Sequence, residues 1–239
     1  MKATQFEFRF RVWILFAIYF LGFWTPWLRY GGFAAPASTT WLELSGELSR
    51  LLPLQTASLI VTCAAIFFSA LGAAFRVWGT AYIGGWVVQS GSMSARSVVA
   101  AGPYRHLRNP LYLGSLLFAL GVAILMPPSG AVFFLVASFV QFWRLILREE
   151  SYLEAQQGEV YLAYKSRVPR LFPSPAACLP ETVARPQWLQ AFIAEMFYVA
   201  MTGCFAVLAW HYNATLLTQA LLICFGLSLV VRAFAAKKV

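Results

Sequence analysis

The chain has 239 residues, of which 60% are apolar and only 11% are charged, and its mean hydropathy is +0.68. Because soluble domains carry about a quarter of their residues as charged groups, this composition excludes a soluble globular protein and predicts an integral membrane protein. Basic residues outnumber acidic residues by 18 to 9. In so apolar a chain we attribute that excess to cytoplasmic loops and to contact with anionic membrane lipids, and we expect no nucleic-acid partner.

The first third of the chain predicts an N-terminal membrane region, residues 1–78, with two spans. The apolar run 12–28 is longer than the ~7–15-residue core of a signal peptide, so we expect a transmembrane helix there. Residues 41–52 place Trp41 and Leu44 on one face at helical spacing and charged residues on the other, which is typical of an interfacial helix. The second span is expected at 54–75.

The middle of the chain, residues 79–175, combines a polar linker with a predicted helical hairpin, residues 111–147. Its two spans, 111–126 and 131–147, are separated only by the four residues Pro-Pro-Ser-Gly. Because this connection is so short, the two helices are predicted to be antiparallel neighbours. Ser115, Ala119 and Ala123 are spaced four apart and form a small-residue stripe that permits close helix contact. The helix is expected to continue past 147 and to end at the Gln-Gly pair 157–158.

The last part of the chain, residues 176–239, adds two apolar runs at 191–210 and 214–234. The whole is therefore predicted to be an all-α, polytopic transmembrane bundle of about six spans. With both termini cytoplasmic, 16 of the 18 basic residues fall on inner segments, and Arg29 and Arg50 fall outside. This distribution follows the positive-inside rule and predicts an inner (plasma) membrane protein whose polar loop 101–112 faces the cytoplasm.

Loop 101–112 reads Ala-Gly-Pro-Tyr-Arg-His-Leu-Arg-Asn-Pro-Leu-Tyr and gathers many donors beside the membrane. Its Gly-Pro turn and the proline at 110, which disfavours helical dihedrals at Asn109, predict an ordered loop that leads into a helix. The hairpin brings this loop beside the end of the fourth span. Interfacial tyrosines, arginine anchors or a solvated helix end explain each feature separately, but the combination indicates a ligand site.

The same residues resemble the isoprenylcysteine carboxyl methyltransferase and phospholipid methyltransferase family. The resemblance covers residues 89–173 and rests on Gly-Pro-Tyr at 102–104, Arg-Asn-Pro-Leu-Tyr at 108–112, Glu-Glu at 149–150 and Val-Pro-Arg at 168–170. It implies an integral membrane enzyme that binds S-adenosylmethionine in a pocket at the cytoplasmic face. The acceptor is implied to be a lipophilic molecule or lipid that enters from the membrane between helices.

The resemblance also implies the roles of individual residues. Cofactor contacts are implied at Gln89, Arg96, Ser97, Val98, Val99, Gly102, Tyr104, Arg108, Asn109, Pro110, Leu111, Tyr112 and Glu149. Catalytic roles are implied at Arg144, Glu149 and Glu150. The family usually has histidine where this chain has Asn109, and often has arginine where this chain has Leu145, so that Arg144 or Arg148 would contact the substrate.

S-adenosylmethionine carries an ammonium group, a carboxylate and a ribose diol, which suit glutamate and arginine partners, and methyl transfer needs positioning rather than a metal. The scattered cysteines and two isolated histidines predict no metal site. The favoured acceptor is a prenylcysteine-type carboxylate, with the amine of phosphatidylethanolamine or a small thiol as alternatives. A non-catalytic transporter or assembly subunit is the alternative of another class, although the span centres carry no charge.

Overall fold

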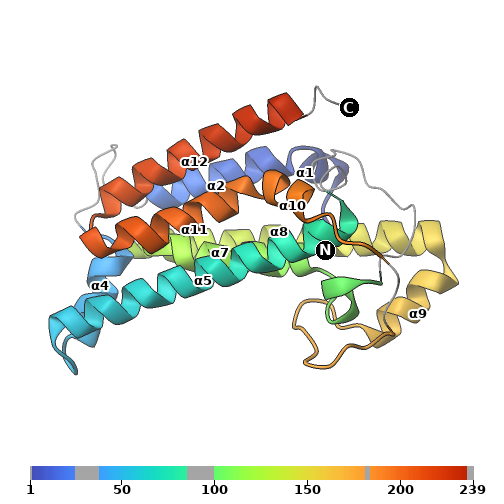
Figure 1. The fold of residues 1–239 in the computed structure, drawn as a ribbon, viewed down its shortest axis with the longest axis horizontal. Coiled ribbons are helices and arrows are strands. Elements are labelled where there is room, and N and C mark those ends of the chain that lie inside the picture. The colour runs from blue at the N-terminus through green and yellow to red at the C-terminus, as the bar shows by residue number, and fades with distance from the viewer. Residues whose placement is uncertain (1, 25–37, 85–99, 181–183, 236–239) are drawn as a thin grey trace.

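The computed structural model describes residues 2–24, 38–84, 100–180 and 184–235, and the described part is helical without β-strands (Figure 1). The predicted all-α class is confirmed. The helices are α1 (Gln5–Arg9), α2 (Arg11–Trp24), α4 (Thr40–Leu48), α5 (Leu54–Ile83), α7 (Pro110–Ala123), α8 (Pro128–Gln157), α9 (Glu159–Arg167), α10 (Trp188–Ala194), α11 (Met196–Leu208) and α12 (Ala214–Ala235), with short 3₁₀ turns η1 (Gly102–Arg105) and η2 (Ala209–His211).

Within the described residues, three helices are long and apolar enough to cross a membrane: Leu54–Ile83, Pro128–Gln157 and Ala214–Val231. Helices α10 and α11 would make a fourth span if taken together, although they meet at an angle of 75°. Helices α2 and α7 are apolar but have 14 residues each, fewer than the ~20 that a bilayer core requires. All six expected segments are thus helical, while three or four of them qualify as spans.

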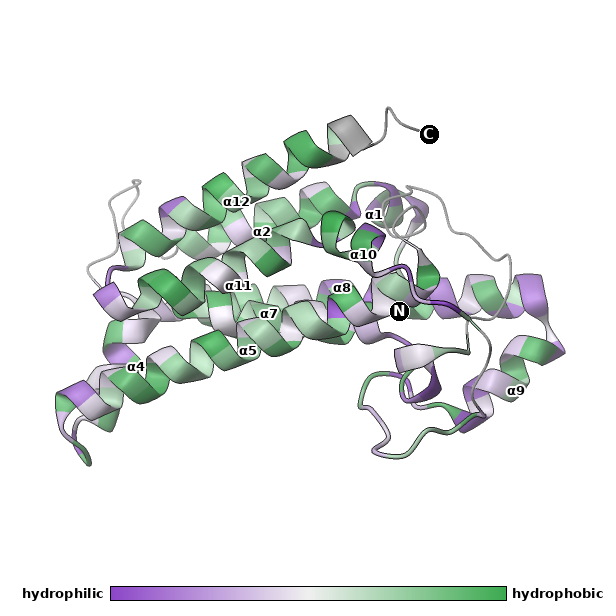
Figure 2. Cartoon of the chain, viewed as in Figure 1, coloured by the Kyte–Doolittle hydropathy of each residue, from purple (hydrophilic) through white to green (hydrophobic). Residues whose placement is uncertain are grey.

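Apolar residues cover the helices of the bundle, and hydrophilic residues gather at the end that carries η1 and α9 (Figure 2). The N-terminal helix α1 and the last turns of α12 lie at this same end, opposite α4 (Figure 1). Both ends of the described chain therefore lie at the same end of the bundle as loop 101–112.

Helices α5 and α7 approach closely because glycines line their contact. A Cβ atom on Gly72 would lie 2.6 Å from the carbonyl oxygen of Gly114, and one on Gly121 would lie 2.1 Å from Ser69 Oγ. The predicted small-residue stripe at 115, 119 and 123 is buried, but the closest contacts come from the neighbouring glycines. This packing fixes the start of α7 against α5.

The expected antiparallel hairpin is formed by α7 and α8, whose connection at 124–127 ends in a proline that precedes Pro128 at the first helical position. Helix α4 closes this turn, since Thr40 Oγ1 donates to Met126 O at 2.8 Å and Trp41 N to Ile124 O at 2.9 Å. Trp41 is buried there, in the hydrophobic cluster that includes Ile124 and Met126. Leu42 and Leu44 are the exposed apolar residues of α4.

Candidate active site

The loop that carries the expected site begins at Gly102, a position that accommodates only glycine. Its φ is +53°, and a Cβ atom there would lie 2.4 Å from the ring of Tyr82 on α5. The 3₁₀ turn η1 therefore lies directly on the end of α5 and buries Tyr104, whose backbone carbonyl accepts a hydrogen bond from Tyr164 Oη at 2.9 Å.

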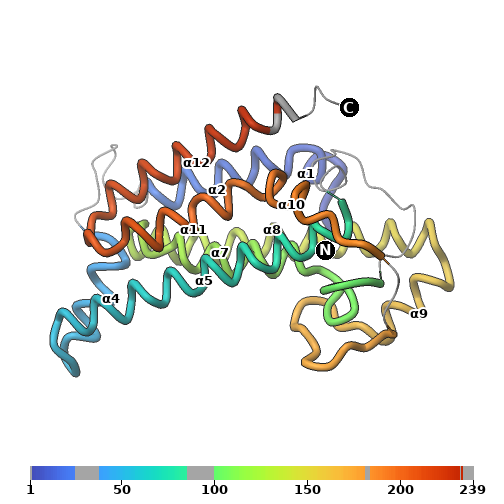
Figure 3. Tube along the Cα trace, viewed as in Figure 1, coloured from blue at the N-terminus to red at the C-terminus, as the bar shows by residue number. Residues whose placement is uncertain are grey.

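A second segment, residues 169–179, wraps around this turn (Figure 3). Arg108 N donates to Pro169 O at 2.8 Å, and Ser174 N donates to His106 O at 2.9 Å. These bonds join parts of the chain that are about sixty residues apart. This proline-rich segment is thus one wall of the loop.

Glu150 ties the two segments to α8. Its buried carboxylate accepts hydrogen bonds from Arg170 Nη2 at 2.9 Å and from Asn109 Nδ2 at 3.3 Å. Arg108 Nη1 forms an ion pair with the same carboxylate at 3.2 Å. With these three partners, Glu150 is held inside the protein and is poorly placed to accept a ligand's hydrogen bonds.

Glu149 points in another direction, because consecutive residues of an α-helix differ by about 100° around its axis. Its Oε1 accepts a hydrogen bond from Tyr112 Oη at 2.7 Å, and the Tyr112 ring packs against Phe142 at 5.7 Å. The structure thus brings both members of the acidic pair into contact with the Asn-Pro-Leu-Tyr turn. Pro110 is the first residue of α7, and Asn109 is its N-cap.

Two side chains of the loop carry buried polar atoms that have no hydrogen-bond partner among the described residues: Tyr104 Oη and Arg108 Nε. Burial raises the pKa of Tyr104 well above its usual value, and the negative charges of Glu149 and Glu195 add to this effect. The hydroxyl therefore remains protonated at neutral pH. An unpaired buried donor is costly unless a ligand accepts from it.

Arg144 does not lie with this group. Its Nε and Nη2 donate to the carboxylate of Glu7 at 3.1 and 2.9 Å, and Ala3 N donates to the Arg144 carbonyl at 3.1 Å. Arg148 Nη1 donates to Ala3 O at 3.0 Å. The two arginines therefore hold the N-terminal segment along α8, an interaction that the sequence did not predict.

The sequence analysis also missed a buried ion pair beside the loop. Arg76 was counted among cytoplasmic loop residues, but it lies within α5 and donates from Nε to Glu195 Oε2 at 2.6 Å. The signal was present, because Glu195 is the single acidic residue of the apolar runs 191–210 and 214–234. A lone carboxylate in such a run predicts a buried basic partner.

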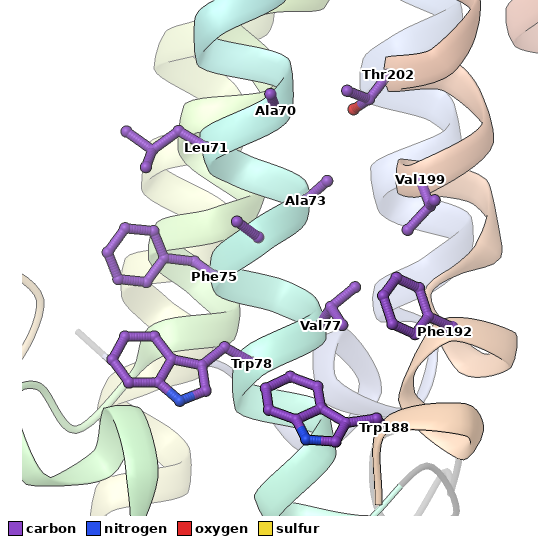
Figure 4. A pocket seen from close by; sticks show the side chains of 11 residues that line it. Ala70, Leu71, Ala73, Phe75, Val77, Trp78, Trp188, Phe192, Val199 and Thr202 are labelled. Carbon is purple, nitrogen blue, oxygen red and sulfur yellow. The ribbon is translucent and has the colours of Figure 1, made fainter.

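An apolar groove of about 600 Å³ lies between α5 and the pair α10–α11 (Figure 4). Its walls include Trp78 and Val77 from α5 and Trp188, Phe192 and Val199 from α10 and α11. The ring of Trp78 also lies 6.1 Å from that of His106, so the groove reaches the loop.

Five of the expected cofactor residues, Gln89, Arg96, Ser97, Val98 and Val99, fall outside the described residues. The others lie on η1, in the connection between η1 and α7, on the first turn of α7 or in the C-terminal part of α8. Among the described residues, no group of three or more potential metal ligands is found.

Comparison with known families agrees with this geometry. Residues 60–159 match the family model of phospholipid methyltransferases. The match includes η1, α7 and the acidic pair on α8, and it ends before α10, α11 and α12. No curated protein and no solved structure matches the chain. Residues 60–159 are therefore similar to the phospholipid methyltransferase family, one of the two families that the motifs at 102–112 and 149–150 resemble.

Proposed function

We propose that the protein is an integral membrane enzyme that transfers a methyl group from S-adenosylmethionine to a lipophilic acceptor. The observation that carries this proposal is that the matched domain contains both a carboxylate held by Tyr112 at 2.7 Å, that of Glu149, and a buried hydroxyl without a partner among the described residues, that of Tyr104. A ligand that has both donor and acceptor groups requires an acceptor and a donor from the protein.

The residues present fit this cofactor. Glu149 suits the ammonium group or the ribose diol as an acceptor, and Nε of Arg108, which has no hydrogen-bond partner among the described residues, suits a carboxylate. When bound, S-adenosylmethionine supplies a methyl group on a positively charged sulfur. The residues of this chain then position the reactants in line and exclude water, which is the main requirement of a direct displacement.

The groove between α5 and α10–α11 suits the hydrocarbon part of the acceptor. Its lining is apolar, its volume of about 600 Å³ is in the range of ligand sites, and it reaches the loop at Trp78. A carboxylate acceptor is already anionic and needs a positive partner, whereas an amine must lose a proton during attack. Because Glu7 occupies Arg144, the guanidinium of Arg144 is not available to an acceptor carboxylate in this structure.

The test of this proposal is methyl transfer by the purified full-length protein in lipid nanodiscs. Label from S-adenosylmethionine is followed into phosphatidylethanolamine, a prenylcysteine analogue and an alkyl thiol, offered in parallel. We expect one class to be labelled, and the labelled class identifies the acceptor. Absence of product with all three, from protein that binds the cofactor, would favour a binding protein over an enzyme.

We further propose that the site faces the cytoplasm of a plasma membrane. The argument is the position of both described chain ends beside the loop, together with the distribution of basic residues (Figure 1). Reporter fusions at Ser129 and Asn213 should give an outer signal, and a fusion at Ser174 an inner one. The reverse pattern would contradict this orientation.

A further inference from the structure

Glu195 lies at the break between α10 and α11, where the chain turns by 75°. Its side chain is fully buried and accepts hydrogen bonds from Arg76 Nε at 2.6 Å and Nη2 at 3.1 Å, and from Thr80 Oγ1 at 2.7 Å. A carboxylate in this position is tolerated only because it is paired. The bend of the C-terminal helices is thus anchored to α5 through one guanidinium.

The same guanidinium continues to α7. Arg76 Nη1 donates to Ser115 Oγ at 2.6 Å and to the Leu111 carbonyl at 3.3 Å, and its plane lies 4.1 Å from the ring of Tyr198 on α11. Leu111 precedes Tyr112 in the first turn of α7. Arg76 therefore joins α5, α7 and α11 at the turn that presents Asn109 and Tyr112 to the acidic pair.

We infer that Arg76 and Glu195 are positioning residues of the active site, which hold the first turn of α7 so that Tyr112 meets Glu149. The C-terminal helices lie beyond the matched domain, and through this pair they are part of the functional enzyme. This inference rests on the proposed function, but its geometric part is testable without cofactor.

Two further observations support the inference. A buried ion pair adds little stability over well-packed apolar side chains of similar volume. A contribution to stability alone therefore explains poorly why the chain has a charged pair at Arg76 and Glu195. Moreover, the charges of Glu149 and Glu195 raise the pKa of Tyr104 and the charge of Arg76 lowers it, so the ion pair and the acidic pair both act electrostatically on this buried hydroxyl.

The first test is a double-mutant cycle on thermal unfolding of the full chain in detergent. Tyr112→Phe removes the hydrogen bond to Glu149 and should lower the unfolding midpoint of the wild type. In Arg76→Met/Glu195→Met, which removes both charges at similar volume, the same change should have no effect, because Tyr112 is no longer held against Glu149. Additive effects would overturn the inference, since a purely structural pair would not couple to Tyr112.

Ser115→Ala provides a second background that removes one contact of Arg76 and leaves the ion pair intact. The cycle is repeated in it, so the inference stays testable if the double variant does not fold. We expect Tyr112→Phe to have a smaller effect there than in the wild type, and an equal effect would contradict the inference.

Turnover separates positioning from stability. In Arg76→Met/Glu195→Met and in Ser115→Ala, kcat should fall about tenfold, with KM for the acceptor nearly unchanged. The control Glu47→Ala/Arg50→Ala removes an exposed ion pair on α4 and the turn after it, at the opposite end of the bundle, and should leave kcat unchanged. Wild-type kcat in both test variants would overturn the inference. Absence of cofactor binding in the wild type would instead refute the proposed function. The double-mutant cycle on unfolding would then still test whether Arg76 and Glu195 hold Tyr112 against Glu149.

Discussion

Tyr112 donates a hydrogen bond to Glu149 across the α7–α8 hairpin, with 2.7 Å between the two oxygens. The contact closes the polar end of the hairpin and leaves one face of the Glu149 carboxylate beside the loop. Glu150 is bound by Arg108, Asn109 and Arg170, whereas Glu149 is bound by Tyr112. The two adjacent glutamates therefore have different roles. Glu150 holds the loop together, and Glu149 is the residue proposed to bind the cofactor.

Tyr112→Phe should therefore weaken cofactor binding as well as lower stability. It leaves Glu149 without the hydrogen bond that orients it, and such a bond to a charged group contributes about 1.5–3 kcal/mol. The dissociation constant for S-adenosylmethionine, measured by calorimetry, should rise about tenfold. Tyr212→Phe, which removes a hydroxyl after the η2 turn, serves as the control and should leave the constant unchanged.

Glu150→Gln should loosen segment 169–179 from the loop. Breaking a buried ion pair destabilises by about 3–5 kcal/mol, and because the Arg170 side chain is 29% exposed we expect roughly 2–3 kcal/mol. Faster proteolysis after Arg170, together with a lower unfolding midpoint, would show this. Glu154→Gln breaks the more exposed pair with Lys165 and should change either reading by much less. Equal effects of the two variants would contradict the role given to Glu150.

The N-terminal segment should detach at low pH. The hydrogen bonds from Arg144 and from the Thr4 backbone lower the pKa of Glu7 from 4.5 to about 2. A carboxyl with a lowered pKa stabilises the folded state above its unfolded pKa, and this contribution is lost as the pH falls from about 4.5 towards 2. The protection of the amides of residues 3–10 against hydrogen exchange, taken relative to the intrinsic rate at each pH, should fall over this window. In Glu7→Gln the protection should already be low at pH 6, and a pH profile of protection like that of the wild type would contradict the assignment.

Cys204 and Cys224 lie with their sulfur atoms 3.7 Å apart on α11 and α12. A mild oxidant such as copper phenanthroline should take up two electrons as the two thiols lose their protons and form one S–S bond within the chain. The number of cysteines that a maleimide reagent labels after denaturation should then fall from four to two. Cys224→Ser should keep all three remaining thiols reactive, whereas loss of label in that variant would show that other cysteines had been oxidised.

Much of the fold could be predicted because apolar runs and turn residues act locally. The hairpin followed from Pro-Pro-Ser-Gly at 127–130, the end of α8 from Gly158, and the meeting of Asn109 and Tyr112 with the acidic pair from the shortness of that connection. The number of membrane crossings could not be predicted from the sequence. Helix α7 has only 14 residues, and it is buried because it packs closely on α5.

The remaining interactions depend on proximity between distant parts of the chain. Arg76 and Glu195 are 119 residues apart, and Glu7 and Arg144 are 137 apart. Counting basic residues placed Arg76 in a loop, since the count records charge and ignores which side chains pair inside the bundle. The lone carboxylate at Glu195 could have indicated a buried partner, but nothing local identified which arginine it was.

The most direct test of the proposed activity is equilibrium binding of S-adenosylmethionine to the purified full-length protein, compared with Tyr104→Phe and Glu149→Gln. The Tyr104 hydroxyl is buried without a partner among the described residues, so its removal should leave the unfolding midpoint unchanged or slightly raised. The account predicts that the wild type binds the cofactor and that Tyr104→Phe, although fully stable, binds it about tenfold more weakly, as does Glu149→Gln. Absence of binding to the wild type, or wild-type affinity in both variants, would contradict it.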